Sequence, residues 1–84
     1  MDILFHTNAW EDYQYFQEND IKVLKKINMI IKDISRSPFS GIGKPEPLKH
    51  SLSGFWSRRI NQEHRLIYTI KDNNIYILQC RYHY

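Results

Sequence analysis

Residues 64–84 read HRLIYTIKDNNIYILQCRYHY, which is two runs of alternating apolar and polar residues joined by Asp72-Asn73-Asn74. Alternation with a period of two is typical of strands that bury one face, and asparagine tolerates the left-handed backbone of a tight turn. We therefore predict a hairpin of two strands, at 64–70 and 75–84, with a three-residue turn between them.

The sequence on the N-terminal side of this hairpin completes the predicted fold. Three further elements are a strand at 55–60 with a three-residue turn at 61–63, a helix that runs from Ile21 to about Ser35, and a first strand at Ile3-Leu4-Phe5. A shorter helix follows that first strand, and either of two side chains, Thr7 or Asn8, suits its N-cap position. The helix from Ile21 carries an apolar stripe at 3.6-residue spacing, with its lysines mostly outside the stripe.

Together these elements predict a single α+β domain over residues 1–84 in the order β-α-α-β-β-β. Two N-terminal helices form a hairpin that packs on a twisted, mostly antiparallel sheet of four strands. A chain of 84 residues is too short for a second domain, and 42% hydrophobic with 25% charged residues is an ordinary globular composition.

The segment 37–53 is a predicted loop, because it is rich in proline and glycine. Pro45 and Pro47 flank Glu46, and each proline restricts both itself and the residue before it. We therefore expect this part of the loop to be stiff. Loops of this length in small domains are usually functional or disordered.

Side-chain parity along the strands predicts which residues face the helices. The residues expected on the helix side are Leu66, Tyr68, Ile70, Tyr76, Leu78, Cys80 and Tyr82. With the predicted turns, Arg59, Arg65 and Arg81 then lie opposite one another in a row on the other face, and His83 emerges there too.

Opposed like charges destabilise a sheet by up to about 1 kcal/mol, so such a row normally has an anion to satisfy it. The guanidinium group matches the geometry of phosphate. The alternative is that the arginines pair with Glu46, Glu63 or backbone carbonyls.

The charge distribution agrees with a polyanion surface. Residues 1–40 hold five Lys/Arg and six Asp/Glu, and residues 41–84 hold seven and three, so the basic excess lies in the second half of the chain. Cys80 is the single cysteine, which excludes a disulfide framework, and the histidines show no zinc-binding spacing. No signal peptide or membrane-spanning run is visible, so we expect a cytoplasmic protein without a metal or other cofactor.

An acid, a histidine and arginines are the groups that metal-free RNA cleavage requires. A base takes the proton of the ribose 2′-OH, an acid protonates the departing 5′ oxygen, and cations stabilise the phosphorane. Glu46 and His83 are the candidates for the acid–base pair, and Lys44, Lys49 and the arginines for phosphate contacts. Tyr84, at the open end, is placed to stack on a base.

The motifs that carry a family resemblance are Lys44-Pro45-Glu46-Pro47-Leu48-Lys49-His50, Leu52-Ser53-Gly54-Phe55-Trp56-Ser57-Arg58-Arg59-Ile60, Glu63-His64-Arg65-Leu66-Ile67-Tyr68 and Cys80-Arg81-Tyr82-His83-Tyr84. With them the chain closely resembles the YoeB toxins of the RelE-like superfamily. The likeness runs from the first strand to the last residue and is densest from Gly43 onward.

The resemblance implies a RelE-like fold and a ribosome-dependent endoribonuclease that cuts mRNA in the A site of the 30S subunit. It implies Glu46 as general base, His83 as general acid and Arg65 as the residue that stabilises the transition state. RNA contacts are implied for Lys49, Arg59 and Tyr84. Our own reading of the residues adds Lys44, which flanks Glu46 in the loop, and Arg81, which the parity argument places in the row.

The implied partners are a YefM-like antitoxin, the ribosome with its mRNA, a second copy of the toxin, and operator DNA only through the complex with antitoxin; no membrane is implied. Two other functions stay open, a non-enzymatic ParE-like toxin and a basic RNA-binding module without chemistry. Neither of these needs Glu46 and His83 as an acid–base pair.

Overall fold

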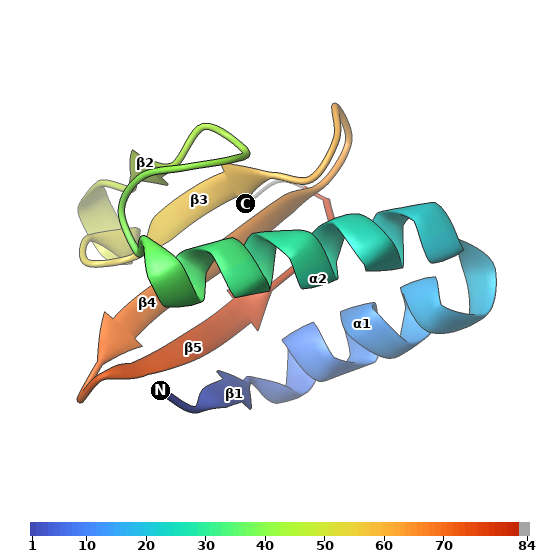
Figure 1. Ribbon diagram of the computed structural model, residues 1–84, viewed down its shortest axis with the longest axis horizontal. Helices are drawn as coiled ribbons and strands as arrows, with labels where there is room; N and C mark the ends of the chain where they lie inside the picture. Colours follow the sequence, from blue (N-terminus) through green and yellow to red (C-terminus); the bar gives the residue numbers. More distant parts are fainter. Residues whose placement is uncertain (83–84) are drawn as a thin grey trace.

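The computed structural model describes residues 1–82, which form two helices on one face of a five-stranded sheet (Figure 1). His83 and Tyr84 lie outside the described residues. The elements are β1 (Ile3–Phe5), α1 (Thr7–Asn19), α2 (Ile21–Arg36), β2 (Glu46–Pro47), the 3-10 helix η1 (His50–Leu52), β3 (Trp56–Arg59), β4 (Arg65–Lys71) and β5 (Asn74–Gln79). The α+β class and the helical hairpin are confirmed.

The sheet has the strand order β1-β5-β4-β3-β2. β1 runs parallel to β5, and the other neighbouring strands are antiparallel, as predicted. The predicted number of four strands is wrong by one, because β2 forms inside the segment 37–53 that we expected to be a loop. Glu46 of β2 pairs with Ser57 of β3. A strand of two residues is too short to show an alternating pattern in the sequence, which is why it was missed. Pro45 and Pro47, on either side of Glu46, hold this backbone extended.

The helices begin at side-chain caps. Asp20 ends α1 and caps α2, where its carboxylate accepts a hydrogen bond from the Val23 N–H at 3.3 Å. The predicted cap of α1 was wrong by one or two residues, because His6 takes that position and its Nδ1 accepts from the Asn8 N–H at 3.3 Å. Within residues 1–82, neither helix is long and apolar enough to cross a membrane.

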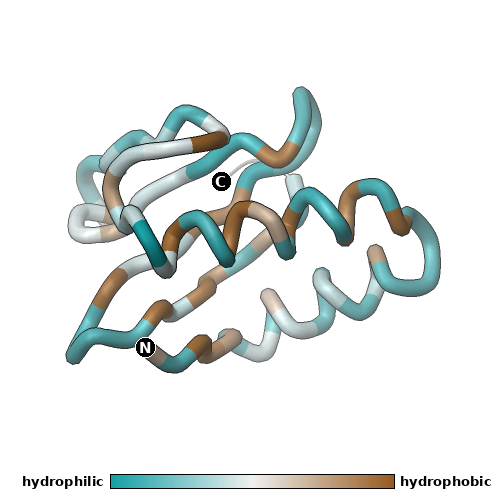
Figure 2. Tube along the Cα trace, in the orientation of Figure 1, coloured by the Kyte–Doolittle hydropathy of each residue, from teal (hydrophilic) through white to brown (hydrophobic). Residues whose placement is uncertain are grey.

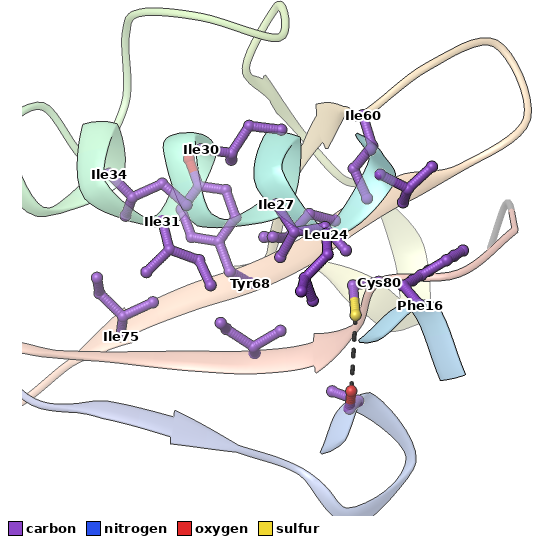
Figure 3. Packing of buried hydrophobic residues seen from close by; sticks show 14 residues of the cluster. Phe16, Leu24, Ile27, Ile30, Ile31, Ile34, Ile60, Tyr68, Ile75 and Cys80 are labelled. Atoms are coloured by element: carbon purple, nitrogen blue, oxygen red, sulfur yellow. Dashed lines mark hydrogen bonds between the residues drawn. The ribbon is translucent and has the colours of Figure 1, made fainter. Parts of the chain in front are cut away.

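The core lies between the helices and the sheet, and α2 contributes more buried residues to it than any other element of residues 1–82. Apolar and polar residues alternate around this helix (Figure 2), and its buried residues are Val23, Leu24, Ile27, Ile30, Ile31 and Ile34. These side chains meet Tyr68 from β4 and Ile75 from β5 (Figure 3). Each such aliphatic side chain contributes about 1.5–3 kcal/mol when fully buried, so α2 is the main support of the sheet.

Parity along β5 differs from our prediction in its first half. The turn has two residues, Asp72 and Asn73, both with positive φ (52° and 60°), and it pairs Lys71 with Asn74. Ile75 and Ile77 are therefore buried in place of Tyr76 and Leu78. An irregularity in the pairing of β4 with β5 at Ile67/Tyr68 then shifts the register by one residue, which returns Cys80 to the core as predicted.

Candidate functional site

The face of the sheet opposite the helices brings three of the predicted site residues together. Leu66 and Tyr68 of β4 belong to the helix-side core. Successive side chains of a strand point to opposite faces, so Arg65, which directly precedes Leu66, projects to the other face. Arg65 pairs with Arg59 of β3, as predicted from the turn at 61–63. Glu46 joins the same face through its pairing with Ser57, two residues before Arg59.

These side chains surround a hollow of about 160 Å³ that is lined by Lys44, Glu46, Ser57, Arg59 and Arg65. A second, larger hollow of about 560 Å³ adjoins it and shares Lys44, Arg59 and Arg65 with it. We call the smaller one the Glu46 hollow and the larger one the Lys26 hollow, after the residue of α2 that lines it. One carboxylate and three cations therefore share the Glu46 hollow.

The side-chain partners within residues 1–82 distinguish the two opposed arginines. Arg65 Nη1 donates to the backbone carbonyls of Asn61 at 2.6 Å and His64 at 3.1 Å, so the alternative of carbonyl partners is correct for this residue. The structure gives the Arg59 guanidinium and the Glu46 carboxylate no hydrogen bond or ion pair with other described residues. Within residues 1–82, neither charged group is thus satisfied by another group of the protein.

A close backbone contact brings the loop to this face. The Gly43 carbonyl accepts a hydrogen bond from the Arg59 N–H at 2.6 Å, and Gly43 itself has φ +79°. A Cβ on Gly43 would lie 2.8 Å from the Arg59 carbonyl oxygen. Lys44 follows with a positive φ of 50°, which turns the chain into β2. Glycine is required here because the conformation and the contact both exclude a side chain.

Arg58, which the sequence analysis did not single out, anchors the preceding part of the loop on the helix side. It is fully buried, and its guanidinium makes five hydrogen bonds. The partners are Tyr68 Oη at 3.1 Å, Asp33 Oδ2 at 2.6 Å, and the carbonyls of Ile42 at 3.2 Å, Ser37 at 2.6 Å and Ser40 at 2.9 Å. Strand alternation was the available signal, since it must send one residue of the Arg58-Arg59 pair to the core.

Two titratable groups reflect this network. The hydrogen bond from Arg58, followed by that from the Ile42 N–H, holds the pKa of the Asp33 carboxyl below its usual value. Burial raises the pKa of the Tyr68 hydroxyl, which donates to the Pro38 carbonyl at 2.6 Å. The loop from Ser37 to Ile42 is therefore held to the sheet and α2 by buried polar bonds.

Arg81 does not join the predicted row. β5 ends at Gln79, and the Arg81 guanidinium lies over the Tyr15 ring of α1, 3.5 Å from its centroid. The row prediction was wrong at this residue because it extended the strand to the end of the chain. Arg81 instead lines a separate hollow of about 170 Å³.

The same hollow contains His64, a second residue that the sequence analysis left without a role. Its Nδ1 accepts a hydrogen bond from the Tyr82 N–H at 2.8 Å, while the Arg65 N–H donates to the Tyr82 carbonyl at 3.0 Å. Tyr82 has a positive φ of 63° and is held on both sides of its backbone. The end of the described chain is thereby fixed beside β4.

The remaining predicted residues lie apart or outside the described chain. Lys49 is exposed at the start of η1 and lines neither hollow. His83 and Tyr84, the predicted general acid and base-stacking residue, fall outside residues 1–82, so their roles stay predictions. Among residues 1–82 no group of three or more His, Cys, Asp or Glu side chains is arranged to hold a metal ion.

The arrangement has a definite chemical capacity. The guanidinium of Arg59 and the ammonium of Lys44 are suited to a phosphate group, which arginine binds in a planar, two-pronged manner. The Glu46 carboxylate in the same hollow is a hydrogen-bond acceptor and can take a proton from a hydroxyl group next to that phosphate.

Comparisons with known proteins agree along the whole chain. A model of the YoeB-like toxins of bacterial type II toxin–antitoxin systems matches residues 5–84. Toxin YoeB of Synechocystis sp. is 62% identical, with 100% of this chain and 98% of that protein covered. Toxin YoeB of Escherichia coli (strain K12) is 57% identical over 100% of both chains.

Solved structures give the same result. The YoeB/ParE toxin of Agrobacterium tumefaciens has a TM-score of 0.98 at 42% identity, with both chains fully covered. The YoeB dimer of Staphylococcus aureus has a TM-score of 0.94 at 56% identity, with 100% of this chain and 98% of that chain covered. The heterotetrameric YoeB-YefM complex of the same organism has a TM-score of 0.93 at 56% identity, with the same coverage. The chain belongs to the YoeB-like toxins of bacterial type II toxin–antitoxin systems.

Proposed function

We propose that this toxin is a ribosome-dependent endoribonuclease that cleaves mRNA in the ribosomal A site by metal-free acid–base catalysis. One observation carries the proposal. The Glu46 carboxylate, which has no partner among residues 1–82, shares a hollow with Lys44, Arg59 and Arg65. A purely structural acid in such surroundings would pair with one of these cations.

The proposed reaction is an attack of the ribose 2′ oxygen on the adjacent phosphorus. Glu46 takes the 2′-OH proton as the new P–O bond forms, and the P–O5′ bond then breaks. His83 supplies a proton to the leaving 5′ oxygen. The products are a 2′,3′-cyclic phosphate and a 5′-hydroxyl, so no water is consumed in this step, and Glu46 and His83 carry both proton transfers.

The basic residues have separate proposed tasks. Arg65 stabilises the negative charge of the phosphorane, and its bonds to backbone carbonyls fix its position before RNA arrives. Arg59 and Lys44 bind the phosphate, and Lys49 and Arg81 contact RNA further along. Tyr84 stacks on a base.

The small size of the Glu46 hollow supports ribosome dependence. The Glu46 hollow, at about 160 Å³, is small and offers little surface to hold a flexible RNA strand by itself. We therefore expect the ribosome to supply the positioning of the 2′-OH in line with the leaving oxygen. Cleavage of free RNA is expected to be slow, and cleavage of A-site mRNA fast.

The proposal includes the partners of a type II system. A YefM-like antitoxin and a toxin dimer are supported by the YoeB-YefM complex and the YoeB dimer of Staphylococcus aureus. Binding to operator DNA is proposed only for the complex with antitoxin. The proposal also places the toxin in the cytoplasm, where ribosomes and mRNA are found, as a single domain over residues 1–84.

Primer extension on translated mRNA tests the activity with the wild-type protein, Glu46→Gln and His83→Gln. Each substitution removes a proton-transfer group, so each is expected to lower the rate about 10²–10⁴-fold. Ribosome binding should persist in both variants. A zinc-selective chelator should leave the wild-type rate unchanged when the Mg²⁺ that the ribosome itself requires is held constant. Product ends complete the test, since a 5′-phosphate product would contradict 2′-OH attack.

The nuclease proposal would be overturned if Glu46→Gln and His83→Gln both inhibited translation as strongly as the wild-type protein does. A basic RNA-binding module without chemistry would then be the better description. Inhibition of a topoisomerase by the same variants would instead favour a ParE-like mode of action.

A further inference from the structure

The Lys26 hollow extends the candidate site toward α2. It is lined by Lys26, Gly43, Lys44, Arg59, Ile60, Asn61, Gln62 and Arg65, and its volume of about 560 Å³ lies within the roughly 300–1,000 Å³ range of ligand pockets. Three of these residues also line the Glu46 hollow, so the two hollows adjoin. A strand of RNA that passes through one has a direct path into the other.

The charge of the Lys26 hollow is of one sign. Four of its lining residues are Lys or Arg, and none is Asp or Glu. Lys26 is half-buried, and it forms no ion pair within residues 1–82. Lys26 lines this hollow together with Lys44 and two arginines, and the repulsion among these like charges is lower when an anion occupies the space that they line. The geometry therefore calls for an external anion.

The position of Lys26 in its helix is specific. Lys25 precedes it, but successive residues of a helix point about 100° apart, and Lys25 is exposed and lines neither hollow. Lys22, one turn earlier, is exposed as well. Among the lysines of α2 within the described chain, Lys26 alone reaches the site.

We propose that Lys26 binds a backbone phosphate of RNA next to the linkage that is cleaved. This inference rests on the proposed function, because the RNA occupies the Glu46 hollow and continues past Arg59. The occupant is a phosphodiester chain because the cations of the two adjoining hollows form one continuous series, which matches a repeated charge. An acidic protein segment is the competing occupant, and among the lining residues within 1–82 Ile60 is the one apolar side chain on which such a segment could anchor.

Lys26→Gln and the matched control Lys25→Gln test this inference on ribosomes programmed with mRNA. Loss of one charge-assisted hydrogen bond is expected to lower kcat/KM for Lys26→Gln about tenfold or more. The slope of log(kcat/KM) against log[salt] should become shallower by about one, as for a lost phosphate contact. Lys25→Gln should stay within about twofold of wild type at each salt concentration, because it lies outside the hollow.

Two further measurements complete the test. Lys26→Arg should restore most of the rate, because it keeps the charge. Binding to vacant ribosomes separates the two sources of phosphate. A loss of binding seen only with mRNA present supports the proposed contact, whereas a loss on vacant ribosomes assigns the contact to ribosomal RNA and overturns its place next to the cleaved linkage.

The inference fails if Lys26→Gln and Lys25→Gln cleave equally well while the wild-type protein is active. It also fails if Lys26→Gln cleaves normally but binds the antitoxin more weakly, since the occupant is then an acidic protein segment. An inactive wild-type protein would instead overturn the proposed function itself. A thermal unfolding curve that matches wild type confirms that each variant is folded.

Discussion

Arg58 and Arg59 are neighbours in β3, yet they lie in two opposite kinds of environment. Arg58 is fully buried on the helix side and donates five hydrogen bonds to groups of the protein. Arg59 is exposed on the other face and lines both hollows. The alternation of strand side chains thus divides one basic pair into a cation that is bonded within the protein and one whose guanidinium has no partner among residues 1–82.

The difference also explains how the two faces depend on each other. Arg58 holds the segment 37–42 from the helix side, and the chain continues through Gly43 to Glu46 on the open face. The carboxylate therefore reaches its hollow by way of a loop that is anchored on the opposite side of the sheet. Substitutions on the helix side should therefore lower mainly the folding stability, and substitutions on the open face should lower mainly the cleavage rate.

The largest expected effect is that of Arg58→Gln on stability. The change removes the donors of the Ser37 and Ser40 carbonyls and one donor of Asp33, and each buried polar group that is left without a partner costs about 1–3 kcal/mol. Chemical denaturation should report this loss. An Arg58→Gln protein as stable as wild type would show that the buried network does not hold the loop.

Arg59→Gln should have the reverse effect. Its folding stability is expected to stay within about 0.5 kcal/mol of wild type, as for surface substitutions away from special features. Its cleavage rate on programmed ribosomes should fall about 10- to 100-fold, because a charge-assisted contact with phosphate is lost. Equal loss of stability in Arg58→Gln and Arg59→Gln would remove the distinction between the two faces.

Gly43→Ala tests the link between the faces. A side chain at φ +79° costs about 1–2 kcal/mol, and its Cβ would press on the Arg59 carbonyl. The loop is expected to shift, so activity should fall more than this modest loss of stability alone would produce. Gly54→Ala is the matched control, because a Cβ there meets no atom within 4 Å although its φ is also positive.

The smallest expected effect is on the stability of the folded protein at low pH. Arg58 lowers the pKa of the Asp33 carboxyl, so the folded protein binds this proton less tightly than the unfolded chain does. The stability from Asp33 is therefore fully present above the ordinary aspartate pKa of about 3.9 and is lost as the pH falls below it. Asp33→Asn should remove that part of the pH dependence of the free energy of unfolding. The prediction would be contradicted if this free energy fell equally steeply below pH 4 in Asp33→Asn and in the wild-type protein.

The sequence predicted much of the fold from patterns that act locally. The stripe of α2 and the alternation of β4 fix which side chains leave water, so both were assigned correctly. Arg59 opposite Arg65 also followed from a short turn. β5 was harder, because a two-residue turn and an irregularity at Ile67/Tyr68 each shift its parity by one residue, and neither has a strong pattern in the sequence.

The sequence by itself determined the α+β class, the family motifs, and the candidate residues Glu46, Arg59 and Arg65. Only the tertiary structure decided what those residues touch. Arg58 became a buried anchor, Arg81 turned to Tyr15, and Lys26 reached the site from α2. The physical reason is that these contacts join elements far apart in the chain, and local patterns of hydrophobicity carry no information about such distances.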